Sequence, residues 1–134
     1  MRKYLCFAAL AGASGVAAGA FGAHALKAIL TEKSTASIWN TASYYQLIHA
    51  AALLGASLGG LSREGTALSV SWLARACVCW SLGIVLFSGS LYALALGGPR
   101  WLGPITPFGG VFLILGWICV LGEARQSGQS AKNN

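Results

Sequence analysis

The sequence predicts an all-α protein, an integral membrane four-helix bundle with both termini on the same side of the membrane. Four long apolar stretches lie between its few charged residues, and each is about as long as the roughly 20 residues that a helix needs to cross a bilayer. Only 9% of the residues are charged and 56% are hydrophobic, whereas about 25% of a soluble domain is charged. A charge at mid-bilayer costs about 3 kcal/mol, so its exclusion from the stretches indicates membrane helices.

Chain length and charge limit the number of domains and the kinds of partner. A chain of 134 residues has room for one domain, which we expect over residues 1–122, followed by a polar, disordered tail over 123–134. No separate soluble catalytic domain fits beside four crossings. The net charge of +6 comes from basic residues scattered at the segment ends, which argues against a nucleic-acid site and indicates anchors at the lipid headgroups.

The first helix is predicted over residues 4–26. A signal peptide is the alternative, because Arg2 and Lys3 form a basic start and residues 23–25 read Ala-His-Ala, a cleavage-like site. The apolar run is longer than the roughly 7–15 residues of a signal peptide core. Three further crossings also need a partner helix, so a spanning helix is favoured.

Four glycines gather on one side of this first helix. At about 100° per residue, four glycines fall within one arc, and bulky residues such as Phe7 gather on the opposite side. The glycine arc consists of Gly12, Gly15, Gly19 and Gly22. Small residues let a neighbouring backbone approach closely in lipid, so we expect a tight helix contact, either within the chain or between copies.

A polar connection over residues 27–40 leads to a second helix, predicted over 41–61. Its polar and small residues follow helical spacing on one stripe, which includes Tyr45 and His49. We expect this stripe to face the inside of the bundle.

The third helix is predicted over residues 72–96, with Ser88 and Tyr92 on its own polar stripe. The fourth is predicted over 106–122, where Pro107 suits the first turn because its missing N–H costs nothing there. The glycine pair that follows Pro107 lacks the lysine and hydroxyl residue of a phosphate loop. Close helix packing explains the pair better.

Orientation follows from the basic residues on the two sides of the four crossings. One side holds Arg2, Lys3, Arg63, Arg75, Arg125 and Lys132, and the other holds Lys27, Lys33 and Arg100. The excess predicts that both termini lie inside.

Short motifs recur in a characteristic order along most of the chain: GAFGAH at 19–24, YYQLIH at 44–49, LFSGSLY at 86–92, TPFGG at 106–110 and LGW at 115–117. In this order and spacing the chain closely resembles the YgdD-type family of small multi-pass membrane proteins, also called domain of unknown function 423. The resemblance implies four transmembrane helices and a bacterial inner-membrane location, with the mitochondrial inner membrane as the alternative. It implies no reaction, substrate or catalytic residue.

The candidate site is a polar cluster of five residues: His24, Tyr45, His49, Ser88 and Tyr92. An ionisable group at membrane depth is by default a functional candidate. We expect His49 to bond Ser88 or Tyr92 in a seam between the second and third helices, with His24 closing its outer end. The same seam also has a purely structural interpretation.

The sequence lacks the residues that would complete a metal, haem or catalytic site. Two histidines invite a metal or haem, but no acidic residue or nearby cysteine completes a ligand set, and Ser88 has no carboxylate for a catalytic triad. The four cysteines lack paired zinc-type spacing and are expected to be free thiols. We therefore predict neither cofactor nor metal and no enzymatic activity.

Three functional classes remain open. The favoured one is a non-enzymatic scaffold or accessory subunit in the membrane, in contact with lipids and with other subunits or copies of itself. The alternative is a lipid or small-molecule binding or transport component that uses the polar cluster. The third is a redox or metal protein.

Overall fold

The computed structural model describes residues 1–62 and 71–132, with the side chains of residues 71 and 129–132 left out. Every regular element in this part of the chain is helical, which confirms the all-α prediction there. The elements are α1 (Arg2–Ala23), α2 (Lys27–Glu32), α3 (Ala36–Leu61), α4 (Ser71–Gly83), the π-helix η1 (Ile84–Ser88), α5 (Gly89–Ala95), the 3-10 helix η2 (Arg100–Leu102) and α6 (Ile105–Lys132).

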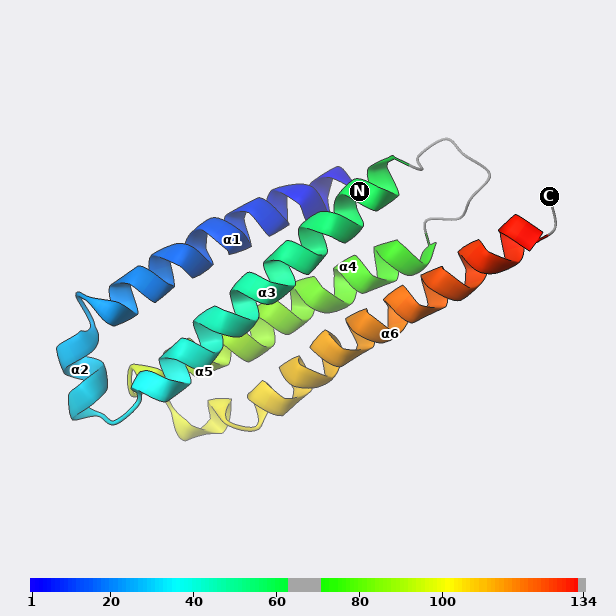
Figure 1. The fold of residues 1–134 in the computed structure, drawn as a ribbon. Helices are drawn as coiled ribbons and strands as arrows, with labels where there is room; N and C mark the ends of the chain where they lie inside the picture. Colours follow the sequence, from blue (N-terminus) through cyan, green and yellow to red (C-terminus); the bar gives the residue numbers. More distant parts are fainter. Residues whose placement is uncertain (63–70, 133–134) are drawn as a thin grey trace.

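Four long rods lie side by side: α1, α3, the continuous segment α4–η1–α5, and α6 (Figure 1). The most extensive packing joins α1 to α3 and α4 to α6, and α3 also contacts α4, η1 and α5. Helix α3 is therefore the central element. The amino-terminal end of α1 and the carboxyl-terminal end of α6 lie at the same end of the rods (Figure 1).

Three helical segments of the described chain are long and apolar enough to cross a membrane: Arg2–Ala23, Trp72–Ala95 and Arg100–Gly128. Helix α3 has 26 residues, so what separates it from these three is its composition. It buries polar side chains, among them Ser43, Gln46, His49 and Ser57. A helix surrounded by other helices can carry polar residues that a lipid-facing helix cannot.

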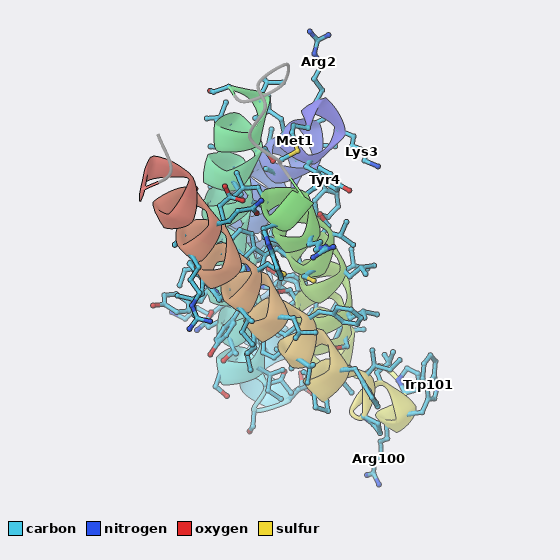
Figure 2. All side chains as sticks on the ribbon, turned by 90° about the vertical axis from the view of Figure 1, so that its right-hand side faces the viewer. Met1, Arg2, Lys3, Tyr4, Arg100 and Trp101 are labelled. Atoms are coloured by element: carbon cyan, nitrogen blue, oxygen red, sulfur yellow. The ribbon has the colours of Figure 1, made fainter. Side chains whose placement is uncertain are left out.

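Basic and aromatic side chains mark the two ends of the rods. Arg2 and Lys3 extend outward at one end, whereas Arg100 and Trp101 extend outward at the other (Figure 2). Such residues are typical of the membrane–water interface. Arg63, which contributes to the predicted charge bias, lies outside the described residues.

The connection after α1 differs from the polar turn predicted over residues 27–40. It contains α2, and α3 begins at Ala36, five residues before the expected Thr41. Leu30 of α2 is 1% exposed and packs with Trp39 and Ala95. Burial of this leucine at the end of the rods organises the connection. The Thr35 hydroxyl also donates a hydrogen bond to the Ala95 carbonyl at 2.7 Å.

The prediction of a disordered tail is wrong for residues 123–132, because α6 continues to Lys132. Glu123 is buried, and the Ser127 hydroxyl donates to its Oε1 at 3.4 Å one turn later. Glu, Ala, Arg and Gln, which dominate the segment after Gly122, are good helix formers. The apolar run ends near Gly122, but the helix does not.

Candidate functional site

Three members of the glycine arc lie against α3. A Cβ atom added to Gly15 would lie 2.9 Å from Leu47 Cδ2, and one added to Gly19 would lie 3.2 Å from Ser43 Oγ. At Gly22 the added atom would meet the Trp39 indole. The glycines therefore provide the space that α3 side chains occupy.

Gly12 does not belong to this contact. A Cβ atom added there would have no neighbour within 4 Å, so its expected role in helix packing is wrong. On a helical projection Gly12 stands at the edge of the glycine arc, opposite the edge formed by Gly22. The buried side of α1 is centred instead on Ala8, Ala11 and Gly15.

Close approach exposes the α1 backbone to polar side chains of α3. Gln46, which is buried, donates through Nε2 to the Ala11 carbonyl and to Ser14 Oγ, both at 2.8 Å. The Ser14 hydroxyl itself donates to the Ala11 carbonyl at 3.2 Å. A buried amide is thus satisfied by a neighbouring helix, as an amide at membrane depth requires.

Two more side chains of α3 extend this row. Ser43 Oγ donates to the Gly15 carbonyl at 3.0 Å, and Trp39 Nε1 donates to the Ala18 carbonyl at 2.8 Å. We call Trp39, Ser43 and Gln46 the donor row. The donor row is absent from the polar stripe predicted above, although the spacing 39, 43, 46 follows the i, i+4, i+7 pattern of one helical face.

His49 uses both ring nitrogens inside the protein. Its Nδ1 lies 2.8 Å from the Tyr45 carbonyl, and its Nε2 lies 3.2 Å from Trp117 Nε1. A carbonyl only accepts and an indole only donates, so His49 carries its proton on Nδ1 and accepts at Nε2. The Tyr45 ring stacks beside it, with centroids 5.9 Å apart.

The predicted seam between His49 and the third helix is therefore wrong. The partner of His49 is Trp117 of α6, and no hydrogen bond joins His49 to Ser88 or Tyr92 in the described residues. Within the described residues, the hydroxyl oxygens of Ser88 and Tyr92 are buried without a hydrogen-bond partner. The Tyr92 ring packs edge-on against Trp39 at 4.6 Å.

His24 does not close the cluster. It follows the last residue of α1 and its side chain is exposed. His49 lies 13 residues beyond Ala36, the first residue of α3, which places it about 20 Å along the axis. The expectation that both histidines share one end failed because α3 begins earlier than predicted.

The described residues contain no group of three or more His, Cys, Asp or Glu side chains arranged to hold a metal. Cys6, Cys77, Cys79 and Cys119 are all free thiols. Cys77 is buried with its Sγ 3.7 Å from Ser57 Oγ. Of the predicted polar cluster, the structure brings together only Tyr45 and His49.

A shallow groove of about 440 Å³ opens beside the donor row. It lies between α1 and the segment η1–α5, with Gln46 of α3 also lining it. Ser14 and Tyr92 contribute the other polar side chains of its wall, and the remainder is apolar apart from Gly89.

Comparison with known proteins places these features in a family. A family model described as "Protein of unknown function (DUF423)" matches residues 18–110. Similar chains include a UPF0382 membrane protein of Staphylococcus epidermidis, 43% identical over 123 residues that cover 90% of this chain and 93% of the relative. A UPF0382 membrane protein of Haemophilus influenzae is 44% identical over 117 residues, covering 87% and 88%.

The UPF0382 inner membrane protein YgdD of Escherichia coli is 41% identical over 120 residues, which cover 90% of this chain and 87% of the relative. These matches confirm the resemblance drawn from the sequence motifs. No solved structure matches the chain.

Proposed function

This chain belongs to the DUF423 family of membrane proteins of unknown function, and from that premise we propose that it is a non-enzymatic scaffold or accessory subunit. One observation carries the proposal: Gln46 and His49, both buried on α3, are engaged in hydrogen bonds within the protein. His49 uses both nitrogens, and Gln46 directs its amide group at the α1 backbone. A general base or metal ligand needs an available lone pair, and His49 Nε2 already accepts from Trp117.

The proposal includes four crossings of the bacterial inner membrane with both termini inside. The name of the Escherichia coli relative supports the location. Helix α3 is long enough to cross, and its side chains Ser43, Gln46, His49 and Ser57 are buried, which supports a fourth crossing beside the three apolar segments. The excess of basic residues on the side of the termini supports the orientation.

Reporter fusions test this topology. A cytoplasmic reporter fused after Asn134 is expected to be active, and a periplasmic reporter inserted in the α2–α3 connection near Ser34 is expected to be active as well. If both reporters are inactive, the proposed orientation is reversed. If both positions lie on the same side of the membrane, the number of crossings is wrong.

Purification in mild detergent tests the scaffold role. We expect the tagged chain to purify in a defined complex with other membrane subunits or with further copies of itself. Partner contact is expected on an exposed apolar face, so a photo-crosslinker at Ile114 of α6 or Leu10 of α1, which are 61% and 70% exposed, would form a discrete protein adduct at one position. A monomer without protein adducts at either position would contradict the proposal.

Binding of a lipid tail or small apolar molecule is the second candidate, favoured by the groove beside Ser14 and Gln46. The sequence had suggested a binding site that His24 and His49 share, but the two side chains lie apart. A stoichiometric lipid or quinone extracted from the purified chain, lost when Gly89 is replaced by Leu to fill the groove, would favour this candidate over a scaffold. A Soret band or stoichiometric metal would instead indicate a redox or metal protein.

A further inference from the structure

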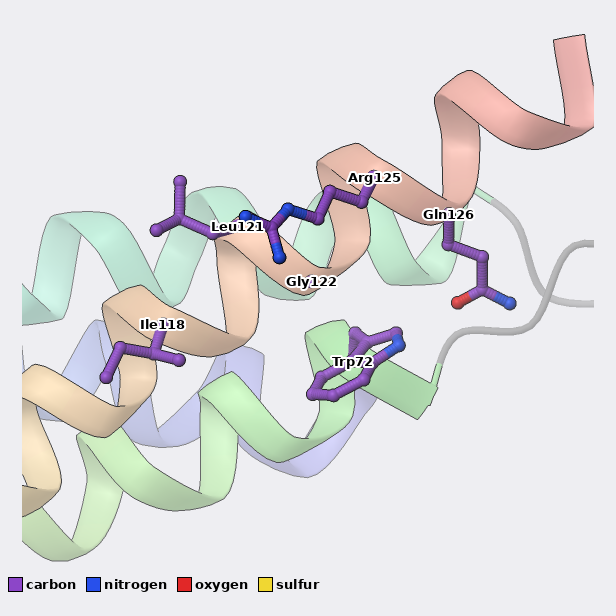
Figure 3. Close-up of a pocket in the computed structure, with 6 residues that line it drawn as sticks. All are labelled: Trp72, Ile118, Leu121, Gly122, Arg125 and Gln126. Atoms are coloured by element: carbon purple, nitrogen blue, oxygen red, sulfur yellow. The ribbon is translucent and has the colours of Figure 1, made fainter. Parts of the chain in front are cut away.

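A second cavity lies at the end of the rods where both chain ends lie, between the start of α4 and the last apolar turn of α6 (Figure 3). Its volume is about 530 Å³. We call it the interface pocket, and its walls are Trp72, Ile118, Leu121, Gly122, Arg125 and Gln126. None of these residues takes part in the polar interactions described above.

The interface pocket spans the boundary between apolar and polar sequence. Ile118 and Leu121 belong to the last apolar run of α6, and Arg125 and Gln126 follow it after Glu123 and Ala124. Figure 3 shows Gln126 toward the carboxyl-terminal end of α6 and Ile118 toward its middle, whereas the Arg125 side chain runs back along α6 toward Leu121. The lining therefore combines apolar side chains with hydrogen-bond donors and one positive charge, and the Arg125 side chain extends along the apolar part.

Trp72 forms the wall opposite α6 and is held in place from two directions. A Cβ atom added to Gly122 would lie 2.9 Å from Trp72 Cδ2, so the indole packs directly on the glycine backbone. The Arg75 guanidinium lies over the same indole, 4.7 Å from the ring centroid. Tryptophan is enriched at the headgroup level of membranes, and here the Arg75 cation lies over its ring.

The side chains of Arg75 and Arg125 are both exposed. The nearest acidic residue in sequence, Glu123, does not line the interface pocket and is buried with the Ser127 hydroxyl bonded to its carboxylate. Among the residues that line the pocket only Arg125 is charged, so the lining is positive.

We propose that the interface pocket binds one anionic phospholipid. Its phosphate would be held by Arg125 and Gln126, with Arg75 adding a second positive charge across Trp72, and an acyl chain would lie along Ile118 and Leu121. Basic pockets between transmembrane helices bind anionic headgroups, and guanidinium–phosphate bonds are charge-assisted. The site is independent of the proposed scaffold role.

Native mass spectrometry of the full chain, released from detergent with added phosphatidylglycerol or phosphatidylcholine of the same acyl chains, tests the site. We expect the wild-type chain to prefer phosphatidylglycerol. Arg125→Gln is expected to weaken phosphatidylglycerol binding about fivefold, since each basic residue near anionic headgroups contributes about 1 kcal/mol. Its phosphatidylcholine binding is expected to stay unchanged.

Arg100→Gln is the matched control, because Arg100 is also exposed but lies at the opposite end of the rods (Figure 2). Equal losses in Arg125→Gln and Arg100→Gln would mean non-specific attraction and would overturn the proposal, as would no loss in Arg125→Gln.

A competition experiment separates a lipid site from a simple anion site. Millimolar inorganic phosphate is expected to leave the bound phosphatidylglycerol in place, because phosphate lacks the acyl chain that contacts Ile118 and Leu121. Full displacement by phosphate would overturn the assignment to a phospholipid. Circular dichroism of the variants is expected to match the wild-type chain, since both arginines are exposed.

Discussion

The two main helix pairs solve the same packing problem in different ways. In α1–α3, glycines of α1 make room for side chains of α3, and the donor row then bonds the exposed carbonyls. In α4–α6, glycines of α6 receive large aromatic groups and backbone from α4 and η1, and Trp80 Nε1 donates to the Leu113 carbonyl at 3.2 Å.

The difference lies in what each glycine touches. The neighbour of Gly15 is the end of the Leu47 side chain, which can rotate. The neighbour of Gly109 is the backbone of Phe87 and Leu86, which cannot move without shifting η1. The α1–α3 pair is therefore expected to be adjustable and polar, and the α4–α6 pair rigid and dependent on shape.

The strongest test of this comparison is Gly109→Ala. Its Cβ would collide with the Phe87 backbone, and overpacking typically costs about 1–3 kcal/mol; we expect a loss of about 3 kcal/mol in the free energy of unfolding, measured by steric trapping in bicelles. Gly110→Ala is the neighbouring control, since its Cβ would lie 3.7 Å from the Phe87 ring, an ordinary contact. Similar losses in both variants would remove the distinction between backbone and side-chain contacts.

The next test concerns the α1–α3 pair. Gly15→Leu would crowd Leu47 and Gln46 and weaken the bonds to Ala11 and Ser14, so we expect a loss of about 2 kcal/mol and a lower folded yield in detergent. Gly12→Leu is expected to be nearly silent, because nothing lies within 4 Å of its added Cβ. An equal loss at Gly12 would show that the arc as a whole contacts α3.

The donor row is expected to contribute less than the glycines that admit it. Gln46→Leu removes the two donations to Ala11 and Ser14, and intramembrane hydrogen bonds contribute about 0.6 kcal/mol on average and about 1.7 at most. Steric trapping is expected to report a loss within that range. A larger loss would place the stability of this pair in its polar contacts.

The smallest effect is expected at His49, which links the two pairs through Trp117. Glutamine can accept the indole hydrogen in place of Nε2, so His49→Gln is expected to change the free energy of unfolding by less than about 0.6 kcal/mol. A folded His49→Gln chain that loses its partner complex or a bound ligand would assign His49 a functional role instead of a structural one.

The sequence predicted the all-α membrane class because apolar length and charge spacing are local properties. The membrane-protein class and the family also followed from the chain alone. Three glycines of the arc lie where one-face periodicity put them. These features depend on residues within one helix.

Features that depend on two helices at once were predicted poorly. The partner of His49 is Trp117, 68 positions away, and helical spacing within α3 carries no information on which neighbour meets that face. The start of α3 depends on burial of Leu30 against Trp39 and Ala95, which polar composition concealed. The donor row was available from spacing but required knowing that α1 exposes its carbonyls.

Because of the π-helix over Ile84–Ser88, we expect the segment α4–η1–α5 to tolerate the deletion of one residue. Its wide turn, in which the Gly89 N–H reaches the Ile84 carbonyl, contains about one residue more than an α-turn. Loss of a single codon in this segment would restore a regular helix and keep α4 and α5 in their present rotational phase, whereas the same loss within α4 would rotate everything after it by about 100°. The wide turn also brings the Phe87 backbone against Gly109. A lineage that deleted one residue here would be released from the requirement for glycine at position 109, so chain length in one helix and residue choice in another are expected to change together.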